Sequence, residues 1–416
     1  MKLGNNIMDL QKKNRSIILQ TLMKYSPISR IDLSRMTELN KATITAIIRE
    51  FLELGIVKNV GSILASNGRK VAGISLCMEE VVTIVLRIKA HSFNICLCDI
   101  NGGLEEIKEI KYENDVDIYA ILRQLQQQID NAIAYCEVKK KKILGISIAT
   151  LGWLYHHDNK YYIKTDGVPV LGEVDFKEEL SKSYPERELW IDHDANMSAL
   201  AEWQFFCDTE ARTPGSMLSI VGGIGFGGGI IIGGEVFSGH NGIAGEVGHM
   251  GINCLNVHKE RFENGASYGG KFEDYASPLS LRRLVVENLY DYPDSKLAEE
   301  SSLEEIYKAY EAEDRLAVWA VNRIARYLAY GLTGLIFILN PEVIVLGDEV
   351  IKSEMFSKQL HKYLKLFLPE ELYENLDIRF SSYDKNGVLI GAGKAMIKHY
   401  FRTQKFMDFV LAQYRK

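Results

Sequence analysis

Short and cationic side chains share one face of a helix predicted over residues 40–55. The opposite face is apolar, because Ile44, Ile47, Ile48 and Phe51 recur with a period near that of an α-helix. Small residues let a helix approach the edges of base pairs, and Lys and Arg bind phosphates and base acceptors. The pattern therefore favours a helix that enters a DNA major groove. Its candidate contact residues are Lys41, Ala42, Thr45, Ala46 and Arg49.

Cys96 and Cys98 could in principle bind a metal or form a redox pair. They lie in SFNICLCDI, whose β-branched and apolar residues favour a strand, and residues two apart in a strand simply share one face. The 6 cysteines are scattered over 416 residues, unlike those of a small disulfide-rich domain. We therefore interpret them as free thiols.

The contact helix is predicted to follow two others. An amphipathic helix in RSIILQTLMKY is ended by Pro27. Ser29 then caps a short helix that runs to about Met36, with Asp32 as its partner in a capping box. Asn40 caps the contact helix. Two short capped helices joined by about three residues predict a helix-turn-helix.

A hairpin is predicted directly after these helices. GIVKNVG and VAGISLC indicate two strands, and Asn67 and Gly68 suit the turn between them. This turn would present Arg69 and Lys70 to DNA, as the wing of a winged helix. The alternative is a small helical protein-interaction domain with a solvated basic face.

Charge separates this unit from the rest of the chain. Residues 1–78 hold 12 Lys and Arg against 5 Asp and Glu, a formal charge of +7, whereas the remainder carries −13. This favours nucleic acid as the partner of residues 1–78. A hydrophobic content of 47% excludes a disordered chain, and we expect two or three domains. We predict no membrane span or signal peptide, and hence a cytoplasmic protein.

The acidic remainder alternates strands with helices, which indicates an α/β fold. Strands are predicted in EVVTIVLRIKAHSFNICLCDINGG and ILGISIATLG, with a helix in DIYAILRQLQQQIDNAIAYC between them. A glycine-rich hairpin follows in SMLSIVGGIGFGGGIIIGGEVFSG, and another strand in PEVIVLGDE. Two hairpins about 130 residues apart suggest two similar halves that enclose a cleft, as in actin-like phosphotransferases.

An ordered series of strings resembles the ROK family (repressor, open reading frame, kinase), in its repressor branch. They are LNKATITAIIREFLELGIV with NGRK, IDHDANMSALAE, GIGFGGGIIIGGEVFSGHNGIAGEVGHMG, FEDYAS and NPEVIVLGDE. The resemblance implies a winged helix at 1–78 and a two-lobed actin-like (ribonuclease H-like) domain. Its first lobe would comprise 79–194 with 388–416, and its second lobe, with effector and dimerisation elements, 195–387.

The resemblance also implies that kinase activity is lost. Kinases of the family carry a DxGGT phosphate loop, and its positions are occupied here by residues 87–91, RIKAH. On the second hairpin, Ile224 stands where the family often has Thr. Phosphoryl transfer needs this phosphate cradle and a metal.

The family's sugar-contacting positions are better kept. Its END triplet, whose Asp is the kinase base, is similar to Asp192, His193 and Asp194 here, with His193 in place of Asn. Carboxylates accept hydrogen bonds from adjacent hydroxyls, and imidazole can donate or accept. The alternative is a scatter of solvated polar groups. The effector site implied by the resemblance comprises His193, Asp194, Glu246, His249 and Glu273.

The family's zinc site, one His and three Cys, is not kept. Asn264, Ala266 and Lys271 occupy the cysteine positions. Cys254 and His258 lie nearby, but the loop offers no fourth soft ligand. We therefore expect neither a metal nor a cofactor.

These patterns together predict a sugar-responsive transcriptional regulator, a repressor of carbohydrate genes, that binds double-stranded operator DNA. Such operators are usually near-palindromic, so we expect a homodimer or homotetramer. Two alternatives remain: a regulator whose second part only dimerises, and an active sugar kinase. The amphipathic end of the chain, with Phe406, Phe409 and Val410, is expected to pack on the first lobe or on a partner.

Overall fold

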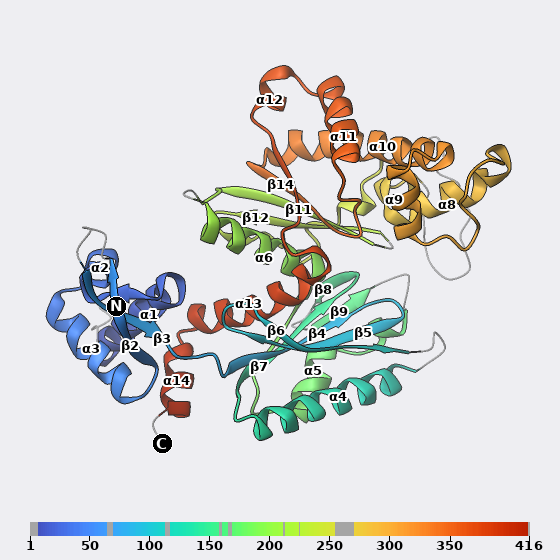
Figure 1. Ribbon diagram of the computed structural model, residues 1–416. Helices are drawn as coiled ribbons and strands as arrows, with labels where there is room; N and C mark the ends of the chain where they lie inside the picture. Colours follow the sequence, from blue (N-terminus) through green and yellow to red (C-terminus); the bar gives the residue numbers. More distant parts are fainter. Residues whose placement is uncertain are drawn as a thin grey trace.

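The computed structural model describes residues 7–64, 70–112, 117–157, 160–164, 169–210, 213–223, 225–253 and 270–414. A small helical unit with a three-stranded sheet lies beside two α/β lobes, each built around one larger sheet (Figure 1). In these ranges, no helix is long and apolar enough to cross a membrane.

The N-terminal unit has the three helices and the two-stranded hairpin that the sequence predicts. A strand of two residues, β1, was not predicted; it pairs antiparallel with β3 and makes the sheet three-stranded. The tip of the hairpin, residues 65–69, is outside the described ranges. The elements are α1 (Ile7–Tyr25), β1 (Ile28–Ser29), α2 (Arg30–Thr37), α3 (Lys41–Glu53), β2 (Val57–Leu64) and β3 (Lys70–Leu76).

Side-chain caps fix where α2 and α3 begin. The Ser29 side chain accepts a hydrogen bond from the Asp32 backbone N–H, and Asn40 accepts one from Thr43, as predicted. The expected capping box differs in its second half, because the Ser29 hydroxyl donates to the Asp32 carboxylate at 2.7 Å. The apolar stripe of α3 is buried, so the helix presents its opposite face to solvent.

The first lobe is built on a five-stranded sheet of order β10-β7-β4-β5-β6. Strands β4, β5 and β6 run antiparallel, and β7 and β10 continue the sheet parallel to β4. Helices α4 and α5 cover one face and α13 the other (Figure 1). The elements are β4 (Val81–Ile88), β5 (Ser92–Asp99), β6 (Leu104–Lys111), α4 (Ile118–Val138), β7 (Lys142–Thr150), α5 (Phe176–Ser183), β10 (Leu189–His193) and the hairpin of β8 (Trp153–His157) and β9 (Lys160–Lys164).

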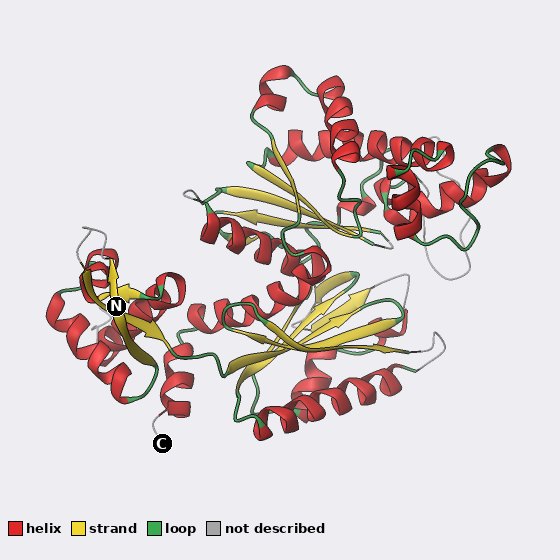
Figure 2. Cartoon of the chain, in the orientation of Figure 1, coloured by secondary structure: helices red, strands yellow, loops and turns green. Residues whose placement is uncertain are grey.

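The second lobe repeats this topology with the order β13-β12-β11-β14-β15. Three antiparallel strands are again extended by two strands parallel to the first of them (Figure 2). Its elements are α6 (Asp194–Thr209), β11 (Ser216–Gly222), β12 (Phe226–Ile232), β13 (Glu235–Val236), α7 (Phe272–Ala276), α8 (Pro278–Asn288), α9 (Leu303–Glu311), α10 (Arg315–Leu339), β14 (Val343–Asp348), α11 (Glu354–Phe367), α12 (Glu370–Glu374) and β15 (Asp377–Phe380). Repetition of one topology explains the two hairpins that the sequence predicts.

Two crossing helices join the lobes. Helix α13 (Gly387–Arg402) packs on the first sheet and α6 on the second, and the two helices pack against each other between the sheets (Figure 1). Their contact is tight: a Cβ atom on Gly391 would lie 1.7 Å from the carbonyl oxygen of Met197. Glycine is therefore required at this crossing.

The C-terminal helix α14 (Phe406–Tyr414) packs on the N-terminal unit. Phe406 and Val410 are fully buried in one hydrophobic cluster with Leu19 and Leu22 of α1 and residues of the first lobe. Lys12 also pairs with Asp408 at 2.6 Å. The sequence predicts packing of this helix on the first lobe or on a partner. The first-lobe contact is present, through Tyr400, whereas the contact with the N-terminal unit was not predicted. A shared core ties that unit to the lobes.

Cys96 and Cys98 lie buried on β5 with free thiols, as interpreted from the sequence. Burial raises the pKa of Cys96 to about 12. A thiol with such a pKa is almost fully protonated at neutral pH and unreactive. Cys96 and Cys98 therefore contribute to the packing of the core.

Candidate functional site

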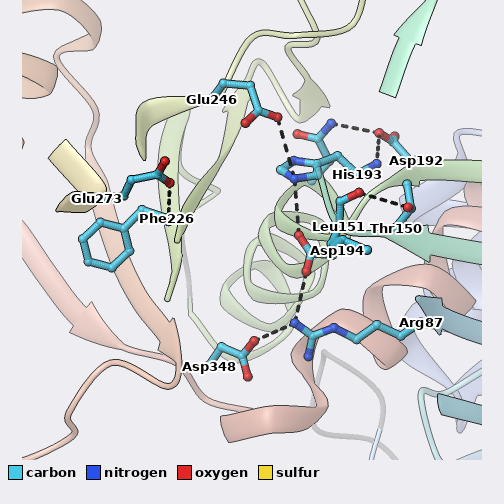
Figure 3. Close-up of polar contacts among 11 residues, drawn as sticks. Arg87, Thr150, Leu151, Asp192, His193, Asp194, Phe226, Glu246, Glu273 and Asp348 are labelled. Carbon is cyan, nitrogen blue, oxygen red and sulfur yellow. Dashed lines mark hydrogen bonds and ion pairs between the residues drawn. The ribbon is translucent and has the colours of Figure 1, made fainter. Parts of the chain in front are cut away.

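A cavity of about 1340 Å³ lies between the lobes. Strands β4, β10, β11 and β14 all end at it, and ligands of open α/β sheets bind outside such carboxyl ends. The structure brings the five residues of the expected effector site together in its lining: His193, Asp194, Glu246, His249 and Glu273. All of them except His249 are labelled in Figure 3.

A strand-to-helix junction positions two of these residues. His193 ends β10 and Asp194 begins α6. The Asp192 carboxylate accepts hydrogen bonds from the His193 backbone N–H at 2.7 Å and from the Asn196 amide at 2.9 Å. These bonds fix the junction, and the helix N-terminus favours a negative charge on Asp194.

Two glycines, Gly229 in β12 and Gly245 directly before Glu246, permit close packing around the site. A Cβ on Gly229 would lie 2.2 Å from the carbonyl oxygen of Ala195 in the first turn of α6. Gly245 has φ +97°, and a Cβ there would lie 1.9 Å from the carbonyl oxygen of Gly228. Only glycine fits such contacts. These glycines therefore set the position of Glu246, the next residue.

An imidazole lies between two carboxylates. His193 Nε2 is 3.4 Å from Asp194 Oδ1 and 3.8 Å from Glu246 Oε1. Burial raises the pKa of Glu246 above its usual range, and the partly offsetting contributions include His193 and a hydrogen bond from Trp153. The group thus combines acceptors with a side chain that can donate or accept, as recognition of sugar hydroxyls requires.

Glu273 and His249 also line the cavity, close to each other. Glu273 Oε2 accepts a hydrogen bond of 3.4 Å from the Phe226 backbone N–H, and His249 Nε2 lies 3.9 Å from Glu273 Oε1. The ring of Trp153 packs edge to face on His249, with centroids 4.9 Å apart. Sequence reasoning missed Trp153. Its place directly after β7, at the same sheet edge as His193, was the available signal.

Lys271, at one of the positions where the resemblance implies a zinc-binding Cys in other members, is buried, with Nζ 3.7 Å from Glu273 Oε1. An ammonium group next to a carboxylate is a local ion pair and not a metal ligand set. Among the described residues no group of three or more metal-binding side chains is found. Outside these residues lie Ile224, Cys254, His258, Asn264 and Ala266.

Arg87 lies where the kinase phosphate loop would begin. Its Nη2 is 3.1 Å from Asp194 Oδ2 and 2.6 Å from Asp348 Oδ2 (Figure 3). Burial lowers the pKa of this guanidinium, but the two carboxylates outweigh that effect and raise it, so Arg87 is charged. Sequence reasoning had treated Arg87 only as a lost motif residue and had not identified Asp348.

The predicted DNA-contact residues of α3 lie on one solvent-facing side. All five are exposed, opposite the buried stripe of the helix. Lys70, at the start of β3, is also exposed, whereas Arg69 lies outside the described residues. The exposed residues of α3 are Lys41, Ala42, Thr45, Ala46 and Arg49.

Comparison with known proteins shows which family has this combination of a winged helix and a two-lobed cleft. The sequence model of the ROK family matches residues 83–399. The chain belongs to the ROK family. A putative xylose repressor of Caldicellulosiruptor sp. (strain Rt8B.4) is 27% identical over 427 residues, covering 98% of this chain and 100% of the relative. The DNA-binding transcriptional dual regulator NagC of Escherichia coli (strain K12) is 27% identical over 359 residues, covering 85% of this chain and 84% of the relative.

A solved ROK structure shares the whole architecture. The crystal structure of a ROK family transcriptional regulator, described as a homolog of the E. coli MLC protein, aligns with a TM-score of 0.75 at 23% identity and covers 97% of this chain and 99% of that chain. This likeness shows the fold, including the N-terminal unit. The two relatives are named as a repressor and as a DNA-binding transcriptional regulator.

Proposed function

We propose that this ROK protein is a transcriptional repressor whose affinity for operator DNA is changed by a sugar bound between its lobes. The observation that carries the proposal is one cavity lined by carboxylates and imidazoles, in a chain that also presents an exposed cationic helix face. Xylose and N-acetylglucosamine, the sugars named for repressors among its relatives, are the first candidates.

The charge of the cavity favours an uncharged sugar over a sugar phosphate. Its described lining holds 8 Asp and Glu against 5 Lys and Arg. A phosphate would add negative charge to an already negative cleft, and like charges at close range cost several kcal/mol. Sugar hydroxyls instead donate to the carboxylates without adding charge.

The coupling to DNA is a thermodynamic linkage. A sugar that prefers one arrangement of the lobes shifts the protein toward it, and any difference in DNA affinity between the arrangements then appears as regulation. A continuous structural route supports this proposal. The effector residue Asp194 begins α6, α6 crosses α13, and α14 packs on α1 of the winged helix.

A thermal-shift titration tests the binding site. Xylose, glucose and N-acetylglucosamine are compared with glucose 6-phosphate, and we expect an uncharged sugar to raise the melting temperature because it binds only the native state. In Glu246→Gln the sugar affinity should fall by about 1.5 to 3 kcal/mol, roughly 10- to 150-fold, because charge-assisted bonds are lost. Glu235→Gln, an exposed position outside the cleft, is the matched control.

The same titration has a predicted pH dependence. Because the pKa of Glu246 is raised, its carboxylate protonates at a higher pH than an ordinary Glu when the pH falls. Sugar affinity of the wild type should therefore weaken as the pH decreases through that range, and the affinity of the Glu246→Gln variant should lack this part of the pH dependence.

No stabilisation by any of these sugars, and no effect of Glu246→Gln, would favour a cleft domain that only dimerises.

We also propose that the protein has no sugar kinase activity. Asp194 matches the kinase base, but Arg87 pairs with it and RIKAH replaces the phosphate loop. A base without a positioned phosphate has no electrophile to act on. Sugar-dependent ADP release should not exceed that of Asp194→Asn, and a clear excess in the wild type would refute this proposal.

A homodimer is the proposed assembly. An operator with two half-sites is read by a twofold-symmetric protein. Apolar side chains are exposed on α10 and α11, and such patches are common at protein interfaces. They are Tyr330, Phe337, Ile338 and Leu366.

A further inference from the structure

Arg87 is a charged residue in a strand that is otherwise an apolar core element. Strand β4 reads VVTIVLRI, and each of its eight residues is buried. A buried guanidinium is costly unless carboxylates pair with it. Here both partners come from distant parts of the chain: Asp194 from the start of α6 and Asp348 from the end of β14.

The ion pair between Arg87 and Asp348 connects the lobes. Arg87 lies on the central strand of the first sheet, whereas Asp348 ends a strand of the second sheet. Asp348 has φ +57°, a left-handed conformation that is uncommon outside glycine. The adjacent Glu349 backbone N–H bonds the Gly222 carbonyl at 3.0 Å, so the turn that carries the Asp348 carboxylate is fixed.

One nitrogen atom serves both carboxylates. Nη2 of Arg87 is within hydrogen-bond distance of Asp194 and of Asp348, so this cation lies between the two negative groups (Figure 3). Without it, like charges would repel across the cleft. The arrangement therefore favours closed lobes in this chain without an added cation or nucleotide.

We propose that Arg87 is a positioning residue: its ion pair with Asp348 holds the second lobe to the first, and its ion pair with Asp194 holds that carboxylate in the orientation that receives the sugar. We call these two contacts the latch. The expected effect of the latch on sugar affinity rests on the proposed function, whereas its expected effect on lobe closure does not require a sugar. Opening the lobes separates Arg87 from Asp348, whereas the bond to Asp194 at the start of α6 can remain.

Small-angle X-ray scattering of the full-length protein without sugar tests lobe closure. Arg87→Met removes the cation, and Asp348→Asn removes only the charge on the second lobe. Both variants should have a larger radius of gyration than the wild type, and Arg87→Lys should restore part of the closure. Arg379→Met is the matched control, because Arg379 also joins two carboxylates, Glu210 and Asp377, but not across the cleft.

Sugar titration of the same variants gives a second readout. With a sugar that binds the wild type, affinity should fall about 5-fold or more in Asp348→Asn, although this residue is not among the expected effector contacts. The double variant should lose no more than Arg87→Met alone, since the two residues act through one contact. If Asp348→Asn and Arg87→Met have the same radius of gyration as the wild type, the proposal of a latch is wrong, even where sugar binding is intact. If they open while no sugar binds, the latch stands and the proposed effector function fails.

Discussion

Replacing Gly391 with alanine is expected to lower the melting temperature of the protein strongly. In most helices this change would stabilise by about 0.5 to 1 kcal/mol, because alanine restricts the unfolded chain. At Gly391 the new Cβ would lie 1.7 Å from the Met197 carbonyl oxygen, which belongs to the backbone of α6 and cannot rotate away. The two helices must separate, and such overpacking typically costs 1 to 3 kcal/mol or more.

Gly334→Ala is the matched control. Gly334 is also within a helix, α10, but the nearest atom to its added Cβ is Met250 Sδ at 3.8 Å, an ordinary contact. This variant should melt at or above the wild-type temperature. Equal melting temperatures for the two variants would contradict the tight crossing of α6 and α13.

Under the proposed function, Gly391→Ala should also weaken the response of DNA binding to the sugar.

Arg49→Ala is expected to reduce operator binding about 5- to 150-fold, which corresponds to roughly 1 to 3 kcal/mol for a base contact. Arg49 is exposed on α3, next to the buried residues that fix the orientation of the helix. If it contacts phosphate, binding to all sequences should weaken, with a reduced dependence on salt. The measurement is a fluorescence anisotropy titration at fixed salt, with DNA that the full-length protein has selected from a random library.

Arg282→Ala removes the same charge from an exposed position on α8 in the second lobe. It should bind the selected DNA like the wild type, because long-range charge effects are screened at physiological salt. Operator affinity of Arg49→Ala equal to that of Arg282→Ala would show that α3 does not dock on DNA as proposed.

The winged helix could be predicted from sequence because its signals are local. Caps at Ser29 and Asn40 lie within three residues of the amides they bind, and the apolar stripe of α3 repeats within four. The small strand β1 was missed, since two residues carry no periodicity and pair only because β3 is already in place. The packing of α14 on the first lobe was predicted, but its contact with α1 was not, because α1 is nearly 400 residues away in sequence.

In the cleft, too, contacts between residues far apart in the sequence could not be predicted. The resemblance supplied residues of the site, and the structure brings them into one cavity. Sequence did not reveal that Arg87 pairs with Asp348, 261 residues further along the chain. An arginine in an otherwise apolar strand signals a buried acidic partner, because an unpaired buried guanidinium is unstable, but it does not say which one. Only the arrangement of the two sheets selects Asp348.

The central claim is that a sugar in the cleft between the lobes changes DNA binding by the winged helix. It is tested most directly by titrating the full-length protein into the selected DNA, by anisotropy, with and without a saturating concentration of the sugar found by thermal shift. We predict that the sugar changes DNA affinity by about 5- to 150-fold, and that Glu246→Gln binds DNA normally but needs far more sugar for the same change. The same DNA affinity in the presence and absence of a sugar that demonstrably occupies the protein would contradict the claim.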